Sequence, residues 1–178
     1  MKGWRTVFYQ AREAGGMATK NEWHGYVEPD YFQFYARRAS AEWASAAVSD
    51  EGRRDRLWSD GHFVYIGTLR KFGATAVDVE VLDAEPDVTS QEWQHVAEIS
   101  LLPGGPFEVL SWNPDEPVAL LDVPEESLRM RVLWKGLVAG RFEGMGQQGE
   151  SEERIAIKIW PSADAPPVVV RRWDGWPL

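Results

Sequence analysis

Cysteine is absent from this 178-residue chain, and that absence removes several kinds of chemistry at once. Without thiols there are no disulfides, no thiolate nucleophile and no Cys-ligated zinc, and the composition favours a cytoplasmic protein. No apolar run reaches 18 residues, so the sequence predicts no membrane-spanning helix. The apolar run near the start is also too short for a signal peptide.

Lysine and arginine are missing from residues 72–128, although the whole chain contains 19 of them. The same stretch is rich in carboxylates, and the net charge of the protein is -9. An acidic protein of this kind is not expected to bind nucleic acid directly. The acids in the stretch are Asp78, Glu80, Asp83, Glu85, Asp87, Glu92, Glu98, Glu108, Asp115, Glu116, Asp122, Glu125 and Glu126.

Motifs for catalysis and cofactor binding are lacking as well. GMGQQG at 144–149 has the spacing of a dinucleotide fingerprint, but acids and a strand pattern follow it where a helix is required. No GxSxG elbow is present, and His24, His62 and His95 have no metal-ligand spacing. Carboxylate pairs for a hydrolase are too numerous to select one. We therefore expect a non-enzymatic protein with no cofactor and no metal.

The dominant pattern is an alternation of apolar and polar residues, which is typical of half-buried strands. It predicts about ten strands and an all-β fold, mainly an antiparallel β-sandwich of jelly-roll or Greek-key type, with a barrel as the alternative. We expect one domain over 1–178, in which residues 1–30 form an N-terminal extension or an extra edge strand. The expected strands are 4–9, 31–36, 62–69, 74–82, 94–101, 107–112, 118–123, 127–134, 154–160 and 168–173.

Helical sequence is confined to residues 40–58, which predict one or two short helices. Ser40 and Ser49 are the candidate N-caps, and Gly52 is expected to break the helix. Further along, SEERIAIKIWPSADAPPVVVRRW at 151–173 reads either as a proline-rich ligand or as two strands joined by a proline-stiffened connection. Alternating residues flank the prolines on both sides, so we favour the strands.

The acidic stretch is the best candidate for a functional surface. A cluster of carboxylates steers a basic protein towards the surface, whereas the simpler interpretation is a solvated face that prevents aggregation. We predict partner-binding roles for Asp78, Glu80, Asp83, Glu85, Asp87, Glu98, Asp115 and Glu116.

Tryptophan is abundant, with 10 in the chain. Exposed coplanar Trp side chains on a β-sandwich would bind sugars, so a carbohydrate-binding module is the alternative function. The competing interpretation is that the Trp side chains fill the core and its rim.

Three segments carry a resemblance to a known family: DYFQFYA, HVAEISLLPGGPFEVLSW and ALLDVPEESLRMRVLW. They resemble the competence protein J family of small β-rich nuclease inhibitors, and IKIWPSADAPPVV is similar to the ending of uncharacterised actinobacterial β-rich proteins. The resemblance implies an inhibitor or immunity-type protein that binds and blocks a basic partner, a nuclease or toxin. Nuclease sites are basic because they bind phosphates, so an acidic surface suits that role.

Overall fold

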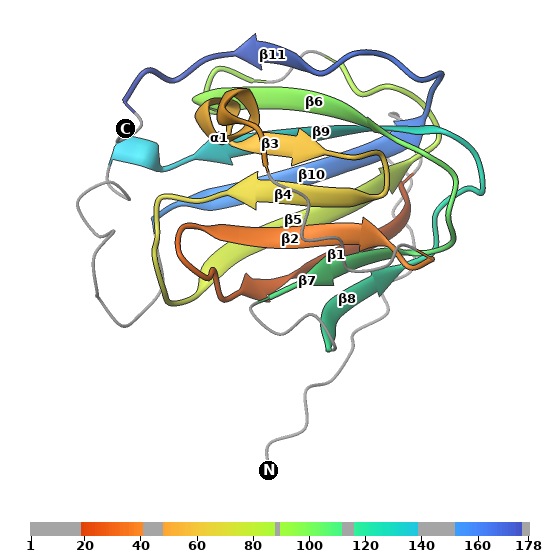
Figure 1. Ribbon diagram of the computed structural model, residues 1–178, viewed down its shortest axis with the longest axis horizontal. Helices are drawn as coiled ribbons and strands as arrows, with labels where there is room; N and C mark the ends of the chain where they lie inside the picture. The colour runs from red at the N-terminus through yellow and green to blue at the C-terminus, as the bar shows by residue number, and fades with distance from the viewer. Residues whose placement is uncertain (1–18, 41–47, 88–89, 112–115, 139–151, 176–178) are drawn as a thin grey trace.

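Two β-sheets packed face to face make up the computed structural model, which describes residues 19–40, 48–87, 90–111, 116–138 and 152–175 (Figure 1). The six-stranded sheet has the order β1(Thr19–Val27), β5(Thr75–Leu82), β10(Arg154–Pro161), β9(Leu128–Lys135), β6(His95–Leu101) and β11(Val168–Arg171). The five-stranded sheet has the order β3(Leu57–Ser59), β4(Phe63–Gly67), β2(Gln33–Arg38), β7(Phe107–Leu110) and β8(Pro117–Leu121). Strand pairs are antiparallel apart from β5 with β10.

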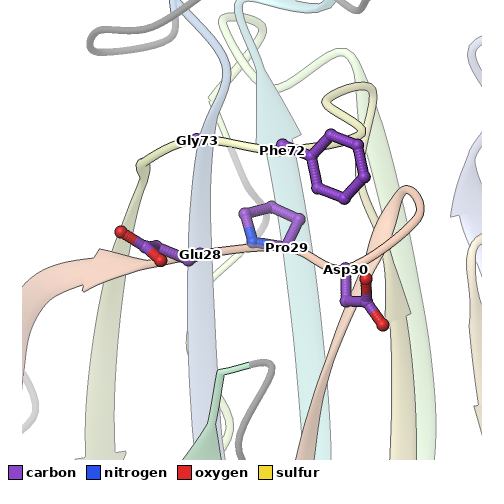
Figure 2. Close-up of a pocket in the computed structure, with 5 residues that line it drawn as sticks. All are labelled: Glu28, Pro29, Asp30, Phe72 and Gly73. Atoms are coloured by element: carbon purple, nitrogen blue, oxygen red, sulfur yellow. The ribbon is translucent and has the colours of Figure 1, made fainter. Parts of the chain in front are cut away.

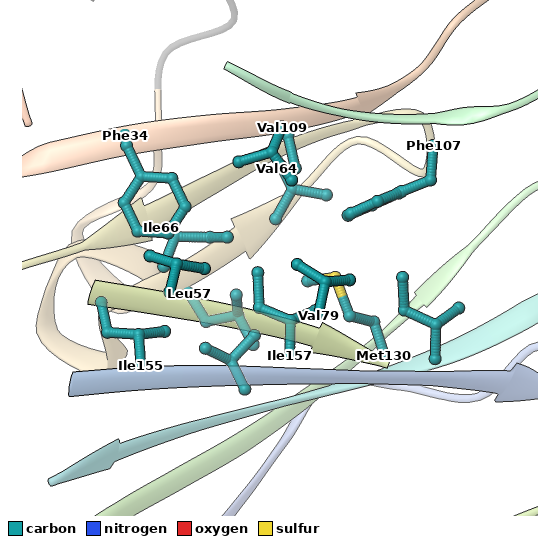
Figure 3. Packing of buried hydrophobic residues seen from close by; sticks show 14 of the residues in the cluster. Phe34, Leu57, Val64, Ile66, Val79, Phe107, Val109, Met130, Ile155 and Ile157 are labelled. Carbon is teal, nitrogen blue, oxygen red and sulfur yellow. The ribbon is translucent and has the colours of Figure 1, made fainter. Parts of the chain in front are cut away.

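The core lies between the two sheets and is formed by the apolar half of each alternating strand. Phe34, Ile66 and Val109 of the five-stranded sheet face Val79 and Ile157 of the six-stranded sheet (Figure 3). These side chains are fully buried, so each strand has one face fixed towards the core. The predicted all-β fold, a mainly antiparallel sandwich with a short helix, is confirmed.

The helix α1(Asp50–Asp55) is shorter than the predicted helical region. Ser49 caps it as expected, because its hydroxyl accepts a hydrogen bond from the Gly52 N–H at 3.0 Å. The expectation that Gly52 breaks the helix was wrong. Gly52 is buried against Trp58, and a Cβ added to it would lie 2.6 Å from the Trp58 Cβ, so close packing explains the glycine.

β1 is a strand that the alternation did not reveal, and it forms one edge of the six-stranded sheet. Its residues facing the core include Gly25, which weakens the apolar pattern. The indole of Trp23 folds over that glycine, so a Cβ there would clash with the Trp23 ring. The predicted strand 4–9, the possible cap role of Ser40 for residues 41–47 and the GMGQQG motif all concern segments outside the described residues.

Candidate functional site

The outer face of the six-stranded sheet carries most of the predicted partner-binding residues. Val77, Val79 and Val81 of β5 point into the core, so the alternation places Asp78 and Glu80 on the opposite, outer face. The neighbouring strands present His24, Lys158 and the arginines of β9 on the same face. This outer face therefore carries both acidic and basic side chains.

Two of the predicted acids are paired across strands. His24 Nδ1 of β1 lies 2.7 Å from Asp78 Oδ1, and this hydrogen bond raises the pKa of His24 against the opposing effect of its partial burial. Lys158 Nζ of β10 lies 3.3 Å from Glu80 Oε2. Basic residues from outside the acidic stretch thus neutralise part of its charge once the strands are assembled.

A buried ion-pair network lies next to these pairs, on β6 and β9. Glu98 is 8% exposed, and its two carboxylate oxygens accept hydrogen bonds from Arg131 Nε at 2.6 Å and Arg129 Nε at 3.1 Å. Both arginines face outward as the alternation predicts, yet each is only 6% exposed because other segments of the protein cover them. Glu98 is therefore committed inside the protein, which corrects its prediction as a direct contact for a partner.

The network anchors the turn at residues 83–87, which we call the acidic turn. Arg131 Nη1 donates to the Pro86 carbonyl at 3.1 Å, and Arg131 Nη2 donates to the Glu85 carboxylate at 3.0 Å. The same guanidinium lies 5.1 Å from the centre of the buried Trp160 ring. One arginine thereby joins the acidic turn to the sheet beneath it.

Arg129 fixes the proline-rich connection between β10 and β11 in a similar way. Its guanidinium donates to the carbonyls of Ala165 at 2.9 Å and Pro166 at 3.0 Å. Ser100 also contacts Ala165, whose backbone N–H donates to the serine hydroxyl at 3.0 Å. The prediction of two strands joined by a proline-stiffened connection is confirmed, and the connection is held on the outer face.

Apart from the buried Glu98, the predicted site residues fall into three groups. Asp78, Glu80 and the acidic turn, with Asp83, Glu85 and Asp87, lie together on the outer face and at the end of β5. Glu116 lies instead directly before β8 of the other sheet, and Asp115 is outside the described residues. Within the described ranges, Asp83 and Asp87 are exposed and form no ion pair.

The role of Arg129 and Arg131 was missed in the sequence, although a signal for it was present. Arg131 lies directly opposite Glu98 in the β6–β9 register, and Arg129 lies opposite Ser100. Opposite charges facing each other across two predicted strands indicate that the strands are neighbours. The alternation alone gave only the face on which each arginine lies.

The site offers charge recognition. No group of three or more His, Asp and Glu side chains in the described part of the chain is placed to hold a metal ion. His95 is buried beside Trp134 at a ring-centre distance of 5.1 Å, and burial lowers the pKa of its imidazole. In the same described segments, no helix is long and apolar enough to cross a membrane.

The described tryptophans do not form an exposed platform. Trp134 and Trp160 are buried, and Trp23 and Trp173 pack against the core. Trp93 is half-buried beneath the Lys135 ammonium, which lies 4.7 Å from the centre of the indole. These positions indicate that the Trp side chains fill the core and its rim. They give no support to the alternative that the protein binds sugars.

Two solved structures are similar to this fold. The crystal structure of ComJ, inhibitor of the DNA degrading activity of NucA, from Bacillus subtilis, matches with a TM-score of 0.59 and 8% identity. It covers 80% of this chain and 98% of that one. The protein named Crocagin biosynthetic gene J matches with a TM-score of 0.50 and 16% identity, over 80% of this chain and 99% of that one.

At these identities the likeness shows a shared fold, and it confirms the remote resemblance seen in the sequence. No protein-family model matches the chain, and no curated protein matches its sequence.

Proposed function

We propose that this protein is a non-enzymatic, cytoplasmic inhibitor that binds a basic protein partner, a nuclease or toxin, and covers its active site. The observation that carries the proposal is the acidic turn, which places the unpaired Asp83 and Asp87 on a rigid support. The fold shared with ComJ, an inhibitor of the DNA degrading activity of NucA, supports the same role.

The physical basis is competition for a phosphate-binding surface. Nucleases hold DNA through Lys and Arg, so exposed carboxylates on a rigid turn present those residues with an alternative to phosphate. A support that holds the turn in place reduces the entropy lost on binding. Arg131 gives the acidic turn such a support by binding both the Pro86 carbonyl and the Glu85 carboxylate.

Fold alone does not decide between functions, because the same architecture also occurs in a protein named for crocagin biosynthesis. The proposed function must therefore rest on the charged residues. Asp78 and Glu80 are paired within the protein, whereas Asp83 and Asp87 form no ion pair with any described residue, which makes these two the acids best able to bind a basic partner.

The test is a DNA degradation assay with nucleases encoded in the genome that carries this chain. We expect at least one to be inhibited at an equimolar ratio, with weaker inhibition at high salt. Reversing Asp83 and Asp87 to Lys should weaken inhibition about tenfold. These positions are preferable to Asp78 and Glu80, whose reversal would also disrupt ion pairs to His24 and Lys158.

The matched control reverses Asp122 and Glu126 to Lys. Both side chains are exposed and, like Asp83 and Asp87, form no ion pair among the described residues, so the change in net charge is the same. Equal loss of inhibition in both double variants would mean that the effect is not confined to the acidic turn. Unimpaired inhibition by the Asp83 and Asp87 variant would exclude the acidic turn as the interface.

A further inference from the structure

A shallow hollow lies at the opposite end of β5 from the acidic turn. Glu28, Pro29, Asp30, Phe72 and Gly73 line it, where the β1–β2 connection meets the β4–β5 connection. Figure 2 shows the Phe72 ring and the Asp30 carboxylate on one side of Pro29 and the Glu28 carboxylate on the other. The eight residues of β5 span about 26 Å, so the hollow is separate from the acidic turn.

Both carboxylates of the hollow are unpaired. Neither Glu28 nor Asp30 has an ion-pair partner within 4.0 Å in the described part of the chain, in contrast to Asp78 and Glu80. The other charges nearby are Lys71 and Arg70. Arg70 is 1% exposed and lies beneath Gly73, and its charge lowers the pKa of the buried Glu153 against the larger, opposite effect of burial.

An exposed aromatic pair borders the hollow and already holds a cation. Tyr31 is 62% exposed and Phe72 is 46% exposed, and their rings meet edge to face at 5.4 Å. The Lys71 ammonium lies 4.4 Å from the centre of the Tyr31 ring and 5.2 Å from that of Phe72. Such large exposed aromatic side chains are typical of the residues that dominate binding energy at protein interfaces.

The backbone around the hollow is fixed from several sides. Glu28 N–H donates to the Ser111 hydroxyl at 2.9 Å, which in turn donates to the Glu28 carbonyl at 2.8 Å. Asp30 N–H donates to the Gln33 carbonyl at 2.8 Å. Tyr31 adopts a positive φ of 49° within this turn, a conformation that costs free energy in a residue other than glycine. The backbone that carries Glu28 and Asp30 is thus held in place before a partner binds.

We propose that this hollow binds an arginine side chain of a protein partner. A guanidinium is planar, donates in several directions and stacks on aromatic rings, so it can stack on Phe72 while it donates to a carboxylate that lines the hollow. The inference rests on the proposed function only in assigning the arginine to the same basic partner. The hollow would then add a second contact, at the other end of the sandwich from the acidic turn.

The experiment titrates the isotope-labelled protein with an acetylated tri-arginine amide at low salt and follows backbone amide shifts by NMR. Tri-citrulline, which has the same shape without the charge, is the control peptide. We expect tri-arginine, and not tri-citrulline, to shift the amides of residues 28–33 and 71–74. Replacing Glu28 with Gln and Asp30 with Asn should weaken the tri-arginine affinity about tenfold.

Two further variants separate a specific site from general attraction. Replacing Lys71 with Met removes the competing cation and should strengthen tri-arginine binding about threefold. Replacing Asp122 with Asn and Glu126 with Gln removes the same net charge elsewhere and should leave the affinity within about twofold. Thermal unfolding of each variant confirms that it is folded.

Amide shifts scattered over the whole protein would overturn the proposal. So would an equal loss of tri-arginine affinity in the Glu28 and Asp30 variant and in the Asp122 and Glu126 variant. Equally tight binding of tri-lysine would overturn the assignment to arginine. Because the assay contains no nuclease, its failure leaves the inhibition assay unaffected, and a failure to inhibit any nuclease leaves the peptide result unaffected.

Discussion

Replacing Glu98 with Gln removes the carboxylate that joins Arg129 and Arg131 beneath the acidic turn. The two hydrogen bonds measure 2.6 and 3.1 Å, and both guanidinium groups are buried. Removing one partner from a buried ion pair usually costs about 3–5 kcal/mol, because an uncompensated charge is left inside the protein. Both arginines keep backbone carbonyl partners, so we expect the lower end, about 3 kcal/mol.

Urea unfolding followed by Trp fluorescence measures this change in the free energy of unfolding. In a protein of 178 residues it corresponds to a fall in Tm of about 6–12 °C. Hydrogen exchange at residues 83–87 should also become faster, because Arg131 would lose the carboxylate that orients it. The control is Glu80→Gln, whose ion pair to Lys158 is about one-third exposed and should be worth less than about 1 kcal/mol. A loss below about 1 kcal/mol for Glu98→Gln, or an equal loss in the control, would refute the reasoning.

Two further predictions concern buried positions. Burial raises the pKa of Glu153 from 4.5 to about 7, so the folded protein binds this proton more tightly than the unfolded chain. The stability that the protonated group contributes is present below pH 4.5 and is lost as the pH rises through 7, by up to about 3 kcal/mol. Urea unfolding at pH 5 and 8 should show a smaller pH-dependent change in Glu153→Gln than in the parent, and an unchanged difference would contradict this pKa. Gly52→Ala tests the packing of α1: helix propensity alone predicts a gain of about 1 kcal/mol, whereas the contact with Trp58 predicts a loss on thermal unfolding.

The sequence predicted the faces of the strands well because alternation is a local property. In β5 and β9 every second residue points into the core, as the pattern of Val77, Val79, Met130 and Val132 indicates. The alternation did not predict β1, because Gly25 occupies a core-facing position where an apolar side chain would otherwise show the pattern. Its space is filled instead by Trp23, a packing detail that no periodicity reveals.

The pairing of charges depends on which strands become neighbours, and the sequence does not state that directly. Lys158 reaches Glu80 only because β10 lies parallel to β5, and Arg131 reaches Glu98 only because β9 pairs with β6. Much of the charge segregation along the chain therefore disappears in the fold. Asp83 stays exposed and forms no ion pair with the part of the chain that the structure describes, so the candidate surface is smaller than the acidic stretch suggested.

The most direct test of the proposed inhibitor is the rate at which it associates with its nuclease. Stopped-flow fluorescence at low and high salt would compare the parent, the Asp83 and Asp87 reversal, and the Asp122 and Glu126 reversal. Electrostatic steering by the acidic turn predicts that the Asp83 and Asp87 reversal slows association about tenfold at low salt. The Asp122 and Glu126 reversal should change the association rate less than about twofold, and high salt should reduce the difference between the variants. Equal association rates for the parent and the Asp83 and Asp87 reversal at low salt would contradict the account.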